Sequence, residues 1–457
     1  MPKPVIAIFD VGKTNKKLFL FDEDYQLVYE RSARFIEVTD EDGEPCENLD
    51  SLRLSVFDSL REIGRLRDFD VRAVNFSTYG ASLVYIDEDG RPLTPLYNYL
   101  KTYPEVLKQK FYEDYGGEEQ FATETASPVL GSLNSGMQIY RLKHEQPQVF
   151  ARVSHALHLP QYMSFLLTGR PCSDLTSIGC HTNLWNFTGG KYHRWVHQEG
   201  VADKLAPIVP ADEVYPAVFP GSNLNIGTGL HDSSAALIPY LTNFQEPFVL
   251  ISTGTWCITL NPFDHSPLSA SDLANDCLCY LQYKGKPVKA ARLFAGYTHE
   301  QELKRLTAHF MQPAAKFRHT RFDPLILRRL EAKFKFKFTD GVNREPLFIG
   351  QVPSRFENDS EAYHALMIDL ALQQEQSTRL VLKDAALRRI FVDGGFGKND
   401  VYMNLVSMLF PGQEVYAASM AQATAMGAAL CIHRHWNSKN LPANMIDLKY
   451  YARLPLS

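Results

Sequence analysis

The feature that most constrains the fold is a glycine hairpin that occurs once in each half of the chain. Residues 8–12 read Ile-Phe-Asp-Val-Gly and residues 250–254 read Leu-Ile-Ser-Thr-Gly. Each segment runs from an apolar strand pattern through a polar turn into a second alternating strand. This recurrence predicts an internal duplication, with an antiparallel meander at the start of each half.

The segments that follow the two hairpins also recur in the same order. Apolar residues at helical spacing fill residues 48–66 and precede a strand pattern at residues 71–78. In the second half, a helical pattern at residues 362–384 precedes a strand pattern at residues 388–395. Helices and strands in alternation are typical of an α/β protein, so we expect two α/β domains with a cleft between them.

The length of the chain supports this division, because 457 residues exceed one ordinary domain. Residues 238–246 contain Pro, Asn and other polar residues, which are typical of a domain boundary. We therefore predict an N-terminal domain of residues 1–242 and a C-terminal domain of residues 243–457.

Charge and composition favour a small-molecule partner. The net charge is −5, and the 47 basic and 52 acidic side chains are well mixed, which predicts neither a nucleic-acid surface nor a polybasic membrane anchor. Only a short apolar run precedes Asp10, too short for a signal peptide or a membrane-spanning helix. We expect a cytoplasmic protein whose seven cysteines are reduced.

Three glycine turns are candidates for binding phosphate groups. They lie at Gly12, at Gly254 and at the pair Gly394 and Gly395, which joins a strand pattern to a helical pattern. Glycine lets bare backbone approach a ligand, and N–H groups at such turns suit phosphate oxygens. A single turn of this kind is at least as often a plain packing turn. The three together favour a phosphate chain between the two halves.

Asp232 is the candidate for acid–base chemistry. It follows Gly229 and opens a helical segment of small residues that begins with Ser233. An Asp at the start of a helix is usually only a cap. Because this one directly precedes the predicted domain boundary, it can lie at the floor of the cleft and accept a proton from a substrate hydroxyl.

These elements, taken in this order, resemble the FGGY carbohydrate kinases of the actin-like, ribonuclease-H-like ATPase superfamily. The resemblance covers essentially the whole chain. It rests on Asp10 with Gly12, on Asp232 within Gly-x-x-Asp-x-x-Ala, on the Thr-Gly-Thr of residues 253–255, and on the Asp-Gly-Gly-Phe-Gly-Lys-Asn of residues 393–399.

The resemblance implies two ribonuclease-H-like domains, ATP in the cleft, and Asp232 as the general base. It places Mg²⁺ between the phosphates, held by Asp10 through water. The residues that it and the turns predict to bind the cofactor are Asp10, Gly12, Lys13, Thr14, Asn15, Thr253, Gly254, Thr255, Gly394, Gly395 and Asn399.

The sugar side is less well defined by the resemblance. Thr78-Tyr79-Gly80 and the Ile-Ser-Thr-Gly-Thr-Trp hairpin are similar to those of rhamnulose and fuculose kinases. Those enzymes carry Asp where this chain has Ser82, and usually Asp and Arg near Tyr99 and Lys101. We predict that Tyr79 and Ser82 contact a 6-deoxyketohexose such as L-rhamnulose or L-fuculose. A pentulose kinase, a non-kinase ATP-binding switch of the same fold, and a homodimer all remain open.

Overall fold

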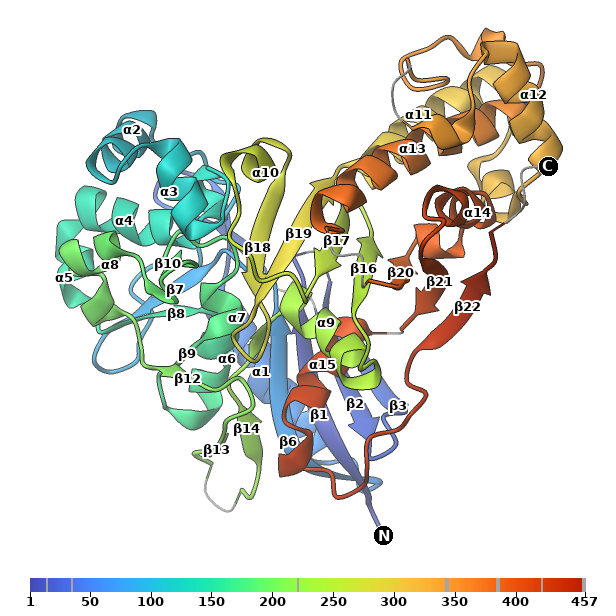
Figure 1. Ribbon diagram of the computed structural model, residues 1–457. Helices are drawn as coiled ribbons and strands as arrows, with labels where there is room; N and C mark the ends of the chain where they lie inside the picture. Colours follow the sequence, from blue (N-terminus) through green and yellow to red (C-terminus); the bar gives the residue numbers. More distant parts are fainter. Residues whose placement is uncertain are drawn as a thin grey trace.

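The structure is a computed structural model that describes residues 1–13, 15–33, 36–219, 222–341, 345–383, 387–420 and 422–453. Figure 1 shows two mixed sheets, with one group of helices at the left and another at the upper right. The last helix, α15, lies near the centre although the strands before and after it belong to the second sheet.

The first sheet has the strand order β13-β14-β6-β1-β2-β3, and β15 also pairs with β6. The central strand β1 is almost fully buried, as expected for a strand covered on both faces. The strands are β1 (Lys3–Val11), β2 (Lys16–Asp22), β3 (Leu27–Ala33), β6 (Phe69–Thr78), β13 (Val214–Pro216), β14 (Asn225–Gly227) and β15 (Leu230–His231).

The second sheet has the strand order β18-β19-β17-β16-β20-β21-β22. Its strands are β16 (Phe248–Thr253), β17 (Cys257–Asn261), β18 (Cys277–Leu281), β19 (Pro287–Leu293), β20 (Arg389–Gly394), β21 (Glu414–Ser419) and β22 (Asp447–Tyr451).

The two sheets repeat the same pairing around their first strands. β1 pairs antiparallel with β2 and parallel with β6, and β16 pairs antiparallel with β17 and parallel with β20. The next strand in the order is also parallel to its neighbour in both sheets: β14 pairs with β6, and β21 pairs with β20. The predicted duplication of an α/β unit is thus present in the topology.

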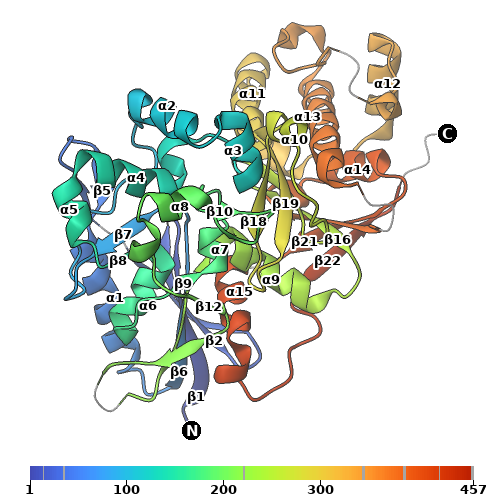
Figure 2. The ribbon, with the colours of Figure 1, turned by 60° about the vertical axis from the view of Figure 1, so that its left-hand side comes forward.

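A large insertion follows β6 and forms the left-hand lobe of Figure 1. Figure 2 shows the same helices coming forward beside β7 and β8. The helices of the first half are α1 (Leu49–Ile63), α2 (Glu105–Asp114), α3 (Glu118–Thr125), α4 (Ser135–Glu145), α5 (Pro147–Arg152), α6 (Leu159–Thr168), α7 (Leu175–Ile178), α8 (Arg194–Gln198) and α9 (Asp232–Asn243).

The remaining strands of the first half pair with one another in two-stranded sheets, β4 with β5, β7 with β8, β9 with β12 and β10 with β11. They are β4 (Glu37–Thr39), β5 (Pro45–Glu47), β7 (Leu83–Ile86), β8 (His155–His158), β9 (Ser173–Asp174), β10 (Trp185–Asn186), β11 (Lys191–Tyr192) and β12 (Ile208–Val209). The hairpin of β4 and β5 is held to the insertion by a backbone bridge between Glu47 and Leu96.

The helices of the second half form the lobe at the upper right of Figure 1, apart from α10 and α15. They are α10 (Ala270–Ala274), α11 (Ala295–Phe310), α12 (Pro324–Phe334), α13 (Asp359–Val381), α14 (Asp400–Leu409) and α15 (Ala423–Cys431). α13 is buried over most of its length and is the centre of a large apolar cluster.

Helices α9 and α15 cross in close contact between the two sheets (Figure 1). A Cβ atom on Gly427 of α15 would lie 1.8 Å from the carbonyl oxygen of Ala235 on α9, so only glycine permits this approach. α15 also packs on β1 and β6, although it comes from the second half of the chain. No helix within the described ranges is both long and apolar enough to cross a membrane.

Candidate functional site

Asp10 lies near the end of β1, where the strand meets the hairpin turn. Its Cα is in register with Ser77 of the parallel strand β6. Its Oδ2 accepts a 2.8 Å hydrogen bond from the hydroxyl of Thr424, near the start of α15. Burial and the nearby charge of Asp232 raise the pKa of Asp10 to about 6, against the opposing effect of the Thr424 hydrogen bond.

Asp232 is the first residue of α9, and its side chain is 31% exposed. Its Oδ1 accepts hydrogen bonds from the backbone N–H of Ser233 at 2.6 Å and from the Ser233 hydroxyl at 3.2 Å. Desolvation raises its pKa to about 6, although the hydrogen bonds from Ser233 oppose this rise. A carboxylate with such a pKa is ionised at neutral pH and is a suitable general base.

A buried histidine supports Asp232 from within the protein. Nε2 of His231 lies 3.2 Å from Oδ1 of Asp232 and 3.0 Å from Sγ of Cys180. Burial lowers the pKa of His231 to about 3, so the ring is neutral, and a hydrogen on Nε2 would face the carboxylate. A Cβ on Gly80 would come within 2.9 Å of the Cys180 sulfur, so this glycine keeps the Tyr79 loop close to His231.

The first hairpin turn is closed by a 2.8 Å hydrogen bond from the N–H of Gly12 to the carbonyl of Asn15. Lys13 points back toward the protein, where its ammonium lies 3.6 Å from Oε1 of Glu47. The same ammonium lies 5.6 Å from the ring centre of Tyr79 and 5.5 Å from that of Tyr99. Thr14, also predicted to bind phosphate, is outside the described residues.

The two residues predicted to bind substrate are nearly buried. Tyr79 is 7% exposed and Ser82 is 2% exposed. The ring of Tyr79 meets the ring of Tyr99 edge to face, with 5.8 Å between their centres. Burial raises the pKa of Tyr99, and the negative charges of Asp232 and Glu47 raise it further. Tyr99 therefore lies close to both carboxylates, and the sequence did not single it out as a site residue.

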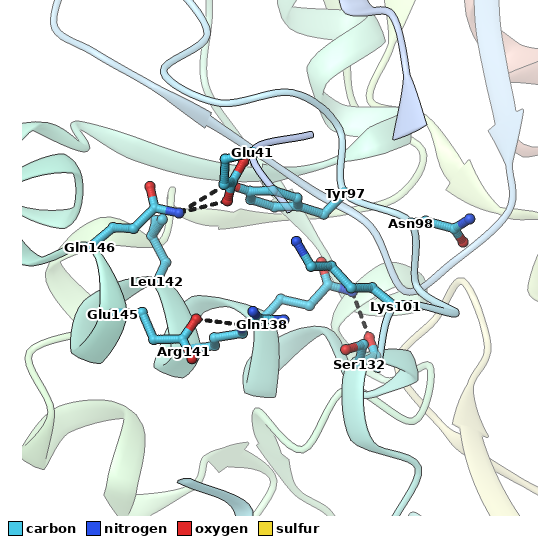
Figure 3. A pocket seen from close by; sticks show the side chains of 10 residues that line it. All are labelled: Glu41, Tyr97, Asn98, Lys101, Ser132, Gln138, Arg141, Leu142, Glu145 and Gln146. Carbon is cyan, nitrogen blue, oxygen red and sulfur yellow. Dashed lines mark hydrogen bonds and ion pairs between the residues drawn. The ribbon is translucent and has the colours of Figure 1, made fainter. Parts of the chain in front are cut away.

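A small cavity of about 30 Å³ lies behind the loop that carries Tyr99, which is room for about one water molecule. Figure 3 shows Gln146 and Tyr97 directed toward Glu41, and Lys101 beside them. Lys101 pairs with Asp40 at 2.5 Å outside this view. These contacts anchor the Tyr99 loop. The cavity is lined by Glu41, Tyr97, Asn98, Lys101, Ser132, Gln138, Arg141, Leu142, Glu145 and Gln146.

The second hairpin is bound tightly to the glycine pair. The hydroxyl of Thr253 donates a 2.5 Å hydrogen bond to the carbonyl of Asp393 and accepts one from the N–H of Phe396 at 3.0 Å. Gly394 has a φ of +90°, and a Cβ on it would lie 2.0 Å from the carbonyl oxygen of Thr253. The structure thus brings Thr253 and Gly394 together, while Gly254 and Thr255 remain exposed at the tip.

The glycine pair does not lead directly into the next helix, as the apolar spacing had suggested. A short 3₁₀ turn, Phe396–Lys398, intervenes, and α14 begins only at Asp400. The side chain of Asn399 caps α14 by accepting a hydrogen bond from the N–H of Tyr402, and it donates to the hydroxyl of Tyr363 at 2.6 Å. Both ends of the Asn399 amide therefore have protein partners.

Asp10 and Asp232 suit a divalent cation that also binds phosphate. The negative charge of Asp232 contributes to the raised pKa of Asp10, which a bound cation would offset. Within the described part of the chain, no three metal-ligating side chains gather into one group. A Mg²⁺ ion here would therefore complete its coordination with phosphate oxygens and water, as Mg²⁺ commonly does.

The family model described as "FGGY family of carbohydrate kinases, N-terminal domain" matches residues 5–238. The one described as "Carbohydrate kinase FGGY, C-terminal domain" matches residues 245–440. The chain belongs to the FGGY family of carbohydrate kinases. This confirms the resemblance predicted from the sequence.

Two curated relatives are rhamnulokinases. The protein from Halalkalibacterium halodurans is 23% identical over 39% of this chain and 39% of its own length. The protein from Mannheimia succiniciproducens is 24% identical over 55% of this chain and 52% of its own length. The chain thus spans about half or less of the length of these relatives.

Solved structures confirm the fold over nearly the whole chain. A carbohydrate kinase from Novosphingobium aromaticivorans has a TM-score of 0.80 and 25% identity, and the match covers 100% of this chain and 95% of that one. A xylulose kinase from Lactobacillus acidophilus has a TM-score of 0.76 and 17% identity, with 99% and 94% covered. Plasmodium falciparum glycerol kinase with ADP has a TM-score of 0.71 and 16% identity, with 95% and 90% covered. The predicted pair of ribonuclease-H-like domains is confirmed.

Proposed function

We propose that this protein is an ATP-dependent sugar kinase that transfers the γ-phosphate to a primary hydroxyl of a ketose. The observation that carries the proposal is the environment of Asp232. Its carboxylate is partly exposed, lies at the amino end of α9 beside Asp10, and has a pKa raised to about 6. Because the chain belongs to the FGGY carbohydrate kinases, we infer that this base acts in phosphoryl transfer.

In this proposal Asp232 accepts the proton of the attacking hydroxyl as that oxygen bonds to the γ-phosphorus and the bond to the β-phosphate oxygen breaks. His231 keeps the carboxylate oriented, because Nε2 lies 3.2 Å from its Oδ1. Mg²⁺, when bound, offsets negative charge on the phosphates. Asp10 would hold it through water, and the hydrogen bond from the Thr424 hydroxyl fixes the orientation of the Asp10 carboxylate.

We place the nucleotide on the second half of the chain, residues 243–457, and the sugar on the first, residues 1–242. The second hairpin and the glycine turn form one hydrogen-bonded unit whose tip, Gly254 and Thr255, is exposed. Bare backbone of this kind suits the phosphate chain. Because both polar ends of Asn399 are already bonded within the protein, we assign the predicted nucleotide contact there to the backbone of the turn.

For the sugar, we propose a 6-deoxyketohexose. The support is the Thr78-Tyr79-Gly80 segment and the Ile-Ser-Thr-Gly-Thr-Trp hairpin, together with the match to two rhamnulokinases at 23% and 24% identity. The residues predicted to touch it, Tyr79 and Ser82, carry no charge at neutral pH. A pentulose is the second candidate, since a structural neighbour is a xylulose kinase.

The test is ADP release in the presence of ATP and Mg²⁺, with L-rhamnulose, L-fuculose, D- and L-xylulose, D- and L-ribulose and glycerol as acceptors. We expect a ketose to have the highest kcat/KM, and a 6-deoxyketohexose to lead. A preference for glycerol would refute the substrate assignment and leave the kinase assignment intact. ATP hydrolysis that no acceptor accelerates would instead favour an ATP-driven switch.

A further inference from the structure

Glu47, the last residue of β5, is a buried carboxylate whose hydrogen-bonding capacity is only partly used. Its side chain is 4% exposed. Within the described residues, no donor forms a well-aligned hydrogen bond to Oε1 or Oε2, although two lysine ammoniums and the Tyr79 hydroxyl lie near them. An ionised carboxylate can accept about four hydrogen bonds, and burying one with fewer donors than it can accept is costly. A ligand that brings hydroxyl donors would remove this cost.

The position of Glu47 is fixed by its backbone. β5 pairs antiparallel with β4, and the N–H of Glu47 donates a 3.3 Å hydrogen bond to the carbonyl of Leu96. Leu96 begins the short segment that leads to Tyr99. The β4–β5 hairpin and the Tyr99 loop therefore hold the Glu47 carboxylate in one place, which is what a recognition residue requires.

The side chains around Glu47 belong to the site already described. The hydroxyl of Tyr79 lies beside its carboxylate, and the negative charge of Glu47 acts on both Tyr79 and Tyr99. Tyr99 is also close enough to Asp232 for that charge to act on it. The rings of Tyr79 and Tyr99 lie 5.8 Å apart, and the Lys13 ammonium that faces Glu47 is 5.6 and 5.5 Å from their centres, so Glu47 borders this ring pair.

Two lysines also face Glu47, but they do not saturate it. The ammonium groups of Lys13 and Lys16 lie 3.6 and 3.3 Å from Oε1. Charge-assisted hydrogen bonds between nitrogen and carboxylate are usually about 2.7–2.9 Å long. Lys13 is 26% exposed and lies on the hairpin predicted to bind phosphate, so a turn of its ammonium toward a phosphate group would remove one of the two cations beside Oε1.

We infer that Glu47 is a specificity-determining residue, and that its carboxylate accepts hydrogen bonds from hydroxyl groups of the acceptor sugar. This inference rests on the proposed function. It supplies the charged sugar contact that neither Tyr79 nor Ser82 provides. It also explains why a polyhydroxylated ligand would be preferred over an apolar one at a site lined by two aromatic rings.

The test compares Glu47→Gln with Glu44→Gln, a matched control on an exposed residue of the same hairpin. KM for the best ketose of the panel and KM for ATP are measured for both, together with the thermal unfolding midpoint. We expect Glu47→Gln to raise KM for the ketose about ten- to a hundredfold, because a hydrogen bond to a charged group is lost. KM for ATP should change less than threefold, and Glu44→Gln should behave as wild type. Glu47→Asp, which retains the charge, serves if the glutamine variant does not fold, and its shorter side chain should also raise KM for the ketose.

A counter-ion role would give a different result. If Glu47 only neutralised Lys13, then Glu47→Gln would change KM for ATP and leave KM for the ketose unchanged. Its effect would also disappear in a Lys13→Ala background. Either result overturns the inference. If the wild type is active and its Glu47 variants keep a normal KM for the ketose, only the role of Glu47 is refuted. If the wild type has no sugar-dependent turnover, the proposed function itself is refuted.

Discussion

The two glycine hairpins share a topology but carry their acidic residue on different strands. In the first half, Asp10 on β1 is in register with Ser77 on β6. In the second half, Ser252 on β16 is in register with Asp393 on β20. The duplicated unit therefore keeps one serine and one aspartate across the same pair of parallel strands, with the two residue types exchanged.

The environments of the two aspartates differ accordingly. Asp393 accepts hydrogen bonds from the hydroxyl of Tyr240 at 3.0 Å and from the N–H of Gly394 at 2.6 Å, which ties the turn at Gly394 to α9. Asp10 faces a second carboxylate, Asp232, and receives the Thr424 hydroxyl from α15. Asp393 is thus satisfied by hydrogen bonds within the protein, while the negative charge around Asp10 suits a cation. We propose that the first copy is the one that serves the chemistry.

The largest effect that tests this contrast is expected for Asp232→Asn. Loss of a general base lowers turnover by about 10²–10⁴-fold. Folding should be nearly intact because asparagine preserves the shape of the side chain. Single-turnover ADP formation with the best ketose measures the effect, and Asp203→Asn, an exposed acid elsewhere in the first half, is the control. Turnover within a few fold of wild type would show that the base lies elsewhere.

The second hairpin should instead be sensitive to a side-chain atom added at Gly394, where two backbone segments pack closely. A Cβ on Gly394, where φ is +90°, would collide with the Thr253 carbonyl, whereas a Cβ on Gly395 meets nothing within 4 Å. We expect Gly394→Ala to lower the free energy of unfolding by about 2–4 kcal/mol and to weaken ATP binding. Gly395→Ala should stay within about 1 kcal/mol of wild type. Denaturant unfolding and nucleotide titration separate the two variants, and equal effects would contradict the close approach.

A smaller effect is expected for the contribution of Asp10 to the pH dependence of the free energy of unfolding. Its pKa is raised from 3.8 in the unfolded chain to about 6 in the fold. Stability from this group is therefore present below pH 4 and is lost as pH rises through about 6. Asp10→Asn removes the buried charge, so it should raise the unfolding temperature at pH 8 by a few degrees, on the order expected for 1–2 kcal/mol. The difference from wild type should vanish near pH 4, and a variant that is less stable than wild type at pH 8 would refute the sign.

The smallest effect is expected for Thr424, whose hydroxyl hydrogen-bonds to Asp10 and so links the second half of the chain to the first. The Thr424 hydrogen bond lowers the pKa of Asp10. Thr424→Val removes it with little change in volume, so the acidic limb of kcat/KM should move to higher pH by less than about one unit. Ser77→Ala is a useful comparison, since Ser77 also lowers the pKa of Asp10 but contributes less. An acidic limb that moves to lower pH would contradict the assigned role of the hydroxyl.

The sequence by itself determined the elements that depend on local pattern. The meander β1–β2–β3, the hairpin β16–β17, helices α1 and α13 and the position of Asp232 at the start of α9 follow the apolar spacing and turn residues. The order of the motifs was also enough to predict the family, which the matches to both FGGY domain models confirm.

The tertiary structure decided which side chains surround the site, because those contacts join residues far apart in the chain. Thr424 reaches Asp10 from 414 positions away, because α15 packs on β1 as well as on α9. Glu47 lies near Tyr79 and Tyr99, and the bridge from β5 to Leu96 helps to hold it there. Local spacing also could not show the 3₁₀ turn before α14, since it depends on hydrogen bonds to Thr253. Periodicity and turn chemistry are local properties of the sequence, whereas the burial and the electrostatic environment of a side chain are set by tertiary packing.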